Sequence, residues 1–302
     1  MDLAALETIV RNLNITRYVS AGACVVLLYD HLLTLDDEIQ YVWKTKTTVP
    51  KVLFLLNRYF VPIVMIVNMY EIAGLSSSHP SDLVCKVWFP ATTFLGSISI
   101  ANGHFIVMLR VWVLWNRRTI PVVFTLVAFV LSQIVTFSMV IWAAIQMIPQ
   151  FEYDTLLRAC VIRKRIIIEG VWLPGVVFEI IVFVMTCWNA MGRPRQSNHE
   201  ITNTLYRDGV TFFITMASLR IANLVLSMVA PLSLVFLGVF FIWCATNITL
   251  SRLIINVRRH SEESLLASAS LEHLDADPEG DHELRVQRSM TYETFPERFE
   301  LH

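Results

Sequence analysis

Charged residues are scarce in this 302-residue chain: they make up 16% of the sequence, against about a quarter of an average soluble domain. Glycine and proline are also few, with 10 and 11 copies, and five cysteines are too few for a disulfide-rich scaffold. These shortages exclude collagen-like, disordered and small disulfide-bonded proteins. A net charge of -1 gives no electrostatic footprint for nucleic acid, so we expect no nucleic-acid partner.

The motifs of common membrane cofactors and enzymes are also missing. Only His31 and His104 lie in apolar segments, where multi-helix haem proteins place paired histidines, and no lysine after Lys164 is available for a retinal Schiff base. The sequence has no HExxH, CxxC, Walker, GxSxG or GxGxxG motif. We therefore expect no cofactor, no metal and no enzymatic activity. A membrane hydrolase with irregularly spaced residues stays open as an alternative.

Apolar residues are abundant instead, at 55% of the chain, and the mean hydropathy is +0.56. A helix that crosses a bilayer needs about 20 apolar residues. Pro231 divides the longest apolar stretch in two, because proline cannot continue a helix ladder. The sequence therefore predicts an all-α fold, a seven-transmembrane helical bundle. Its spans are residues 16–35, 51–73, 88–115, 120–147, 166–189, 209–229 and 231–251.

This layout predicts three regions. Residues 1–15 form a short N-terminal segment without the features of a cleaved signal peptide, and residues 16–259 form the membrane domain. Residues 260–302 form a tail, which holds eleven acidic residues and three arginines from Ser261 onward. We expect that tail to be disordered and acidic.

The distribution of basic residues predicts the orientation. With the N-terminus outside, the inner segments hold eleven Lys and Arg residues and the outer segments hold seven. The positive-inside rule then favours an outer N-terminus and a cytoplasmic C-terminus, although four basic residues at 158–165 weaken the difference. We expect the protein to be a multi-pass protein of the plasma membrane or an endomembrane.

Two outer features agree with this orientation. Asn14 begins an Asn-Ile-Thr glycosylation acceptor, for which a chance tripeptide too close to the membrane is an equal alternative. Cys85 and Cys160 both fall in outer segments, on the oxidising side, so we expect a disulfide between them. Two free thiols are the alternative.

Charged and amide side chains inside the spans are candidate sites, because polar groups at membrane depth are costly. Asp30 and Arg58 lie near the inner ends of the first two spans, so we expect a structural ion pair between them. Three acidic residues of the connecting loop are rival partners for the arginine: Asp36, Asp37 and Glu38.

The deepest polar side chains belong to the third, fifth and sixth spans. They are His104, Glu179 and Arg220, with Asn223 one turn beyond the arginine. A Glu179–Arg220 pair between neighbouring helices would neutralise both charges. This group is either a packing device or the floor of a ligand-binding pocket.

Residues 29–63 carry a specific pattern: Tyr-Asp, an acidic cluster, Trp-Lys and Asn-Arg-Tyr. These residues are Tyr29, Asp30, Asp36, Asp37, Glu38, Trp43, Lys44, Asn57, Arg58 and Tyr59. The pattern resembles the hallmark of a large fungal membrane-protein family, the domain of unknown function 6533, here over about residues 16–75. The segments at 105–118 and 251–259 are similar to that family's third helix and post-membrane end. The resemblance implies a multi-pass membrane location and no established activity.

The layout also resembles that of a G-protein-coupled receptor. Cys85 and Arg110 are 25 residues apart, a spacing similar to that between the bridging cysteine and the inner-end arginine of that superfamily's third helix. The resemblance implies cytoplasmic coupling at Arg110. The sequence departs from the superfamily because Leu109 replaces the acid before the arginine, and because the last span lacks the Asn-Pro and Tyr signature.

These features together predict a receptor-like membrane protein. A small-molecule ligand from outside would contact the deep polar group, and a cytoplasmic signalling partner would detect the resulting helix movement near Arg110. Two other classes stay open: a transporter or channel whose path the same polar residues line, and a structural or partner-organising membrane protein without a ligand.

Overall fold

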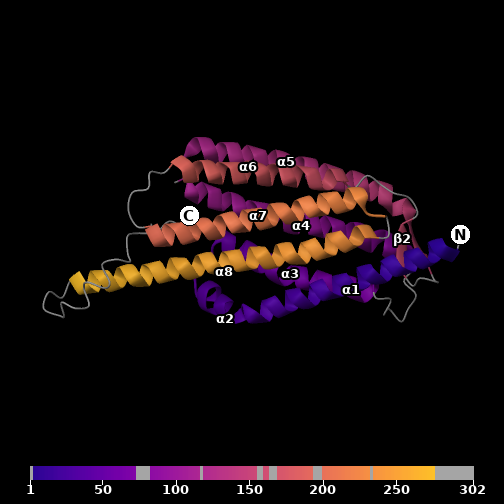
Figure 1. Ribbon diagram of the computed structural model, residues 1–302, viewed down its shortest axis with the longest axis horizontal. Coiled ribbons are helices and arrows are strands. Elements are labelled where there is room, and N and C mark those ends of the chain that lie inside the picture. The colour runs from indigo at the N-terminus through magenta and orange to yellow at the C-terminus, as the bar shows by residue number, and fades with distance from the viewer. Residues whose placement is uncertain are drawn as a thin grey trace.

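The computed structural model describes residues 3–72, 82–115, 118–154, 159–162, 169–192, 199–231 and 234–275. In this part of the chain, long helices run side by side along one axis, and a two-stranded hairpin lies at one end (Figure 1). The all-α prediction is confirmed, apart from the hairpin. The elements are α1 (Leu3–Leu33), α2 (Leu35–Glu38), the π-helical turn η1 (Ile39–Trp43), α3 (Val49–Ile72), α4 (Asp82–Leu114), α5 (Thr119–Met147), the 3-10 turn η2 (Ile148–Gln150), β1 (Phe151–Asp154), β2 (Ala159–Ile162), α6 (Glu169–Gly192), α7 (His199–Val229) and α8 (Val235–Asp275).

Six of these helices, α3 to α8, are long and apolar enough to cross a membrane, by length and composition. Helix α1 meets the same test only together with α2 and η1, which are bent from it by 53°, so the described part has six or seven candidate spans. The lower hydropathy of the first span agrees with the charged residues in it, such as Asp30. These helices identify the chain as a multi-pass integral membrane protein in contact with the lipid bilayer.

Helix α5 shows why lipid must surround the bundle. The side chains that it buries are mostly small or weakly polar, such as Thr125, Ser132 and Ala143, whereas Leu131 and Trp142 are exposed. In water this large apolar surface would be unfavourable. In a bilayer the arrangement is favourable, because small residues allow close helix packing and large apolar residues meet the lipid tails.

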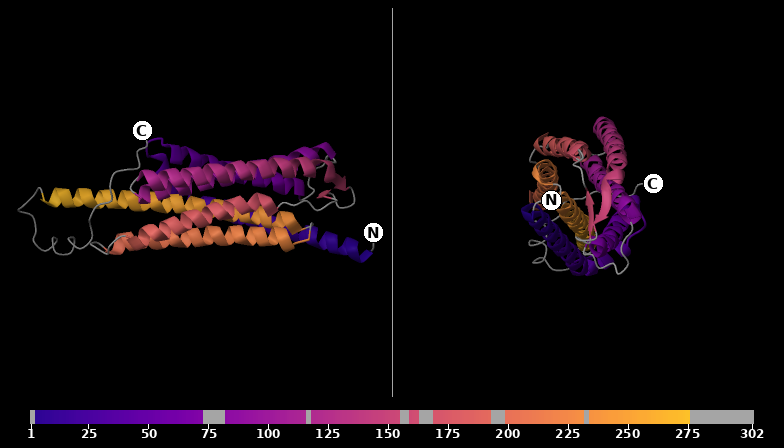
Figure 2. Two further views of the ribbon diagram at one scale, coloured as in Figure 1. Left: turned by 90° about the horizontal axis from the view of Figure 1, so that it is seen from above. Right: turned by 90° about the vertical axis from the view of Figure 1, so that its right-hand side faces the viewer.

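Helix α8 lies inside the bundle, and the other helices surround it (Figure 2). Two-thirds of its span, 67%, is buried in the protein, compared with 17% of the α5 span. The bundle has two distinct ends. We call the end with β1 and β2 the disulfide end, and the end with α2 and η1 the elbow end (Figure 1).

The structure forms a disulfide between Cys85 of α4 and Cys160 of β2, with Cα atoms 5.6 Å apart. Strand β2 pairs antiparallel with β1, and Tyr153 lies opposite Cys160. Phe151 of β1 is fully buried and stacks on Phe89 of α4, with ring centroids 5.2 Å apart. The sequence does not predict this hairpin, because strands of four residues are too short for a period-2 pattern to stand out.

Two boundaries differ from the sequence-based expectation. Helix α1 already begins at Leu3, so most of the segment 1–15 continues the first helix. Helix α8 continues to Asp275, 15 residues past His260, where the sequence predicts disorder. Residues 261–275 hold four Leu, three Glu and two Ala, which favour helix, and Pro278 follows shortly after. The rest of the predicted tail lies outside the described residues.

The glycosylation acceptor lies within α1, not on the surface loop that such a tripeptide favours. Asn14 is half-buried and accepts a hydrogen bond from Arg17 at 3.4 Å. Thr16 is 3% exposed and donates to the carbonyl of Asn12. This burial disfavours modification at Asn14.

Removing the disulfide should lower the stability of the protein. Cys160→Ser should reduce the free energy of unfolding by about 2–4 kcal/mol, because the bond constrains the unfolded chain between residues 75 positions apart. Thermal unfolding in detergent measures this effect. Cys187→Ser, at a free and half-buried cysteine, is the matched control and should leave the unfolding temperature unchanged. Equal unfolding temperatures for both variants would contradict the prediction.

Candidate functional site

Four helices contribute to one buried chain of polar side chains. Glu179 of α6 accepts hydrogen bonds on the same oxygen, Oε1, from Nε of Arg220 on α7 at 3.1 Å and from Nε2 of His104 on α4 at 3.2 Å. On the other side of the histidine ring, Nδ1 accepts from Nε2 of Gln133 on α5 at 3.4 Å. Arg220 is 3% exposed and His104 2%, so both are buried, whereas Gln133 is half-buried.

The hydrogen bonds are compatible with one charge of each sign in this chain. Nε2 of Gln133 faces Nδ1 of His104, and an amide that donates there leaves the imidazole neutral, with its proton on Nε2. Nε2 then donates to the carboxylate of Glu179, which also pairs with the guanidinium of Arg220. One negative and one positive charge therefore cancel. This balance allows the pair to exist at membrane depth.

Local sequence brings α6 close to its neighbours at this point. A Cβ at Gly175 would lie 3.2 Å from Cε1 of His104, which is a tight contact, so the glycine lets the imidazole approach α6 this closely without a shift. The adjacent Pro174 accepts a hydrogen bond on its carbonyl from Oγ of Ser132, at 3.0 Å. Pro174 and Gly175 thus hold α6 against α4 and α5.

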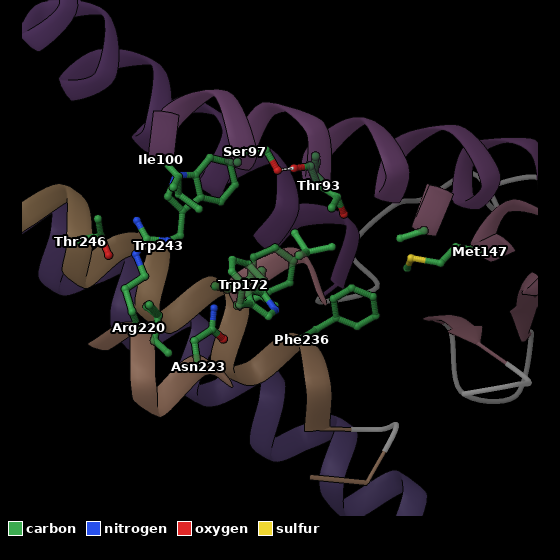
Figure 3. A pocket seen from close by; sticks show the side chains of 17 residues that line it. Thr93, Ser97, Ile100, Met147, Trp172, Arg220, Asn223, Phe236, Trp243 and Thr246 are labelled. Atoms are coloured by element: carbon green, nitrogen blue, oxygen red, sulfur yellow. Dashed lines mark hydrogen bonds between the residues drawn. The ribbon is translucent and has the colours of Figure 1, made fainter. Parts of the chain in front are cut away.

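A cavity of about 50 Å³ lies beside this chain, between α4, α5, α6, α7 and α8. The cavity lies towards the disulfide end, because its lining includes Met147, the last residue of α5, and Phe236, in the first turn of α8. Arg220 and Asn223 approach it from one side and Thr93 and Ser97 from the other (Figure 3). Its remaining surface is mainly aliphatic and aromatic, and the aromatic side chains are Trp172, Phe236, Phe240 and Trp243.

Some buried polar atoms near the cavity have no hydrogen-bond partner among the described residues. They are Nη2 of Arg220, Oε2 of Glu179 and Nε1 of Trp172. Both Arg220 and Trp172 line the cavity. A buried donor without a partner loses the hydrogen bonds that it would make in water, so such atoms mark a place where a ligand can bind.

The four ligand-site candidates from the sequence come together in different roles. Arg220 and Asn223 line the cavity, whereas Glu179 and His104 lie behind Arg220 and hold it. Sequence reasoning missed Gln133, although an amide within an otherwise apolar span is a visible signal. It also missed Trp172, which nothing in the sequence separates from the other seven tryptophans. Among the described residues, no cluster of His, Cys, Asp or Glu could hold a metal ion.

At the elbow end, the buried carboxylate of Glu38 organises a second polar network. It accepts hydrogen bonds from Nε of Arg58 at 2.5 Å, from the Tyr59 hydroxyl at 2.9 Å and from Nε1 of Trp43 at 3.0 Å. Arg58 also donates to Oγ1 of Thr34 at 2.7 Å. Glu38 has no exposed surface and Arg58 is 1% exposed, so each charge depends on the other.

The expected ion pair between Asp30 and Arg58 is therefore wrong, and one of the three alternatives, Glu38, is the partner of Arg58. The elbow, which consists of α2, η1 and the turn after them, reverses the chain after α1 and places Glu38 beside α3. Asp30 instead accepts from Nε of Arg252 on α8, at 2.6 Å. The side chain of Arg110, the predicted coupling residue on α4, lies outside the described residues.

Helix α8 also binds the elbow itself. Arg258 donates to Oγ1 of Thr45 at 2.6 Å, and Arg259 pairs with Asp37. From the first turn of α3, Nζ of Lys51 donates to the carbonyls of Trp43 and Thr45 at 3.1 and 2.7 Å. These bonds join the elbow to both the second span and the last one.

Breaking the buried pair at membrane depth should be costly. Arg220→Ala should lower the free energy of unfolding by about 3–5 kcal/mol, because it leaves the Glu179 carboxylate buried without a counter-charge. Arg220→Ala combined with Glu179→Ala should recover part of this loss. A double-mutant cycle of unfolding temperatures measures the coupling. Additive effects of the two changes would contradict the pairing.

The elbow network gives a similar test with an internal control. Glu38→Ala should destabilise the protein by about 3–5 kcal/mol, because Arg58 loses its buried partner. Asp36→Ala changes an exposed acid of the same short helix and should have little effect. Unfolding temperatures in detergent compare the two variants. A loss in Asp36→Ala as large as that in Glu38→Ala would show that the pair is not what stabilises the elbow.

Comparison with known proteins gives one match. No curated protein and no solved structure matches this chain. Residues 18–63 match the model of a family of unknown function, DUF6533. The matched residues cover the second half of α1, the elbow and the first part of α3, and so include Asp30, Glu38 and Arg58. The sequence-based identification is thereby confirmed: the chain carries the DUF6533 domain at residues 18–63.

Proposed function

We propose that this multi-pass membrane protein is receptor-like: a small ligand binds in the cavity at the disulfide end, and the resulting helix movement changes the elbow end. One observation carries the proposal. Arg220 both lines the cavity and, through Nε, holds the Glu179–His104–Gln133 chain that joins four helices. A ligand that contacts its Nη2 atom would therefore alter the residue on which the packing of those helices depends.

A second set of contacts supports transmission towards the elbow end. Trp243, which lines the cavity, donates through Nε1 to Oγ of Ser99 at 3.0 Å. Ser99 donates in turn to Oδ1 of Asn57 at 2.5 Å, and Asn247 of α8 donates to the Asn57 carbonyl at 3.0 Å. The next residue along the chain is Arg58 of the elbow network. The cavity and the elbow are thus joined through α8, α4 and α3.

The distribution of basic residues supports placing the disulfide end outside and the elbow end in the cytoplasm. The cavity would then face the side from which external ligands arrive, and the oxidising side would hold the disulfide. A cytoplasmic signalling partner would bind near the elbow, the inner end of α8 and Arg110. In this proposal the protein performs no chemical reaction.

A fluorophore at the elbow can test the proposal. Lys44→Cys gives an exposed labelling site, in a background with Cys187→Ser, because the two other free cysteines are buried. In proteoliposomes, a panel of small alcohols, ketones, esters, amino acids and carboxylates should contain at least one solute that changes the fluorescence saturably. Ser99→Ala should weaken this response at least threefold, because it breaks the connection from Trp243 to Asn57.

Ser138→Ala is the matched control, since this exposed serine of α5 bonds only within its own helix turn and lies away from the connection. The receptor proposal would be contradicted if no solute of the panel changed the fluorescence, or if Ser99→Ala and the wild type responded equally. Uptake of a responding solute into the vesicles, abolished by Arg220→Ala, would instead support a transporter.

A further inference from the structure

We infer that the cavity binds a small uncharged molecule, or the head of one, with a carbonyl or hydroxyl oxygen that accepts hydrogen bonds from Arg220 and Trp172. This inference rests on the proposed function and names the chemical class of its ligand. It follows from the unpartnered donors, the charge balance and the size of the site.

The donors indicate an oxygen acceptor. Nη2 of Arg220 and Nε1 of Trp172 are both buried, both lack a hydrogen-bond partner among the described residues, and both belong to side chains that line the cavity (Figure 3). These two atoms can only donate. A carbonyl or hydroxyl oxygen has two lone pairs and can satisfy both donors.

The charge balance excludes an ionised ligand. Arg220 is the one charged residue among the described residues that line the cavity, and Glu179 already neutralises it at 3.1 Å. A bound anion would therefore bring a negative charge that no other charged residue of the described lining compensates. A bound cation would face the guanidinium at close range. An uncharged molecule meets neither difficulty.

The walls define the rest of the ligand. The hydroxyls of Thr92, Thr93 and Ser97 donate to main-chain carbonyls of their own helix, so their oxygen lone pairs are available to a donor in the cavity. The remaining walls are aromatic and aliphatic, which suits an apolar body. The volume of about 50 Å³ is a third of the roughly 150 Å³ that accommodates benzene in an engineered protein cavity, so the bound part has only a few non-hydrogen atoms.

Three planar probes of the same size separate the alternatives. Acetone is uncharged, acetate is an anion and guanidinium is a cation, and their trigonal shapes are nearly identical. With the full chain in lipid nanodiscs, saturation-transfer NMR should detect binding of acetone in the millimolar range. Equal concentrations of acetate or guanidinium should leave the acetone signal unchanged.

Substitutions within the cavity locate the binding. Trp172→Phe removes the donor and keeps the ring, so it should lower the acetone signal at least threefold and leave the unfolding temperature equal or higher. Trp188→Phe is the control on the same helix, at a side chain that is 67% exposed. Gly96→Ala gives a second variant: its Cβ would meet Trp243 at an ordinary 3.7 Å and occupy cavity space, so it should also lower the signal. Gly22→Ala, in open space on α1, is its control.

The outcomes separate this inference from the proposed function. Displacement of acetone by acetate, or an acetone signal that Trp172→Phe and Gly96→Ala leave intact, would overturn the inference. If acetate rather than acetone changes the Lys44→Cys fluorescence, the receptor proposal stands and the ligand class is wrong. If acetone binds in the cavity but neither it nor any other panel solute changes that fluorescence, the ligand class stands and the receptor proposal fails.

Discussion

A carboxylate at membrane depth must be neutralised, and the structure of the bundle depends on how this is done. Glu179 cannot face lipid, so α6 must turn it inward, where Arg220 balances its charge and His104 adds a hydrogen bond. Gly175 gives the imidazole room to approach the α6 backbone there. The cavity forms beside the arginine, whose Nη2 has no hydrogen-bond partner in the described part of the chain.

The same constraint acts at the elbow end and gives the family hallmark a physical meaning. Glu38 is a buried carboxylate with three donors, and all three belong to the residues by which the family resemblance is identified. Asp30, from the same pattern, binds α8 instead. In this chain the hallmark residues thus form a bent connection between the first two spans and attach it to the last one. They build part of the scaffold and do not line the cavity.

Much of this arrangement follows from the sequence. The sequence predicts the pairing of Glu179 with Arg220, because deep opposite charges on consecutive spans have few other partners. It also predicts the disulfide between Cys85 and Cys160, because both cysteines lie on the same predicted side of the membrane. The sequence does not predict the partner of Arg58, because that partner depends on the 53° bend between α1 and the elbow, which no sequence periodicity reveals. The role of Trp172 is equally hidden: a buried indole with a partner and one without look the same in a sequence.

The contacts between the elbow and α8 also bear on how the chain is made. Asp30 and Asp37 bind Arg252 and Arg259, each 222 residues further along the chain. During synthesis the first helix therefore enters the membrane long before the arginines that match its acids exist. By length and composition, helix α1 also qualifies as a span only together with the elbow. The ion pairs that hold the first helix against the last one can therefore form only once the last helix has been made.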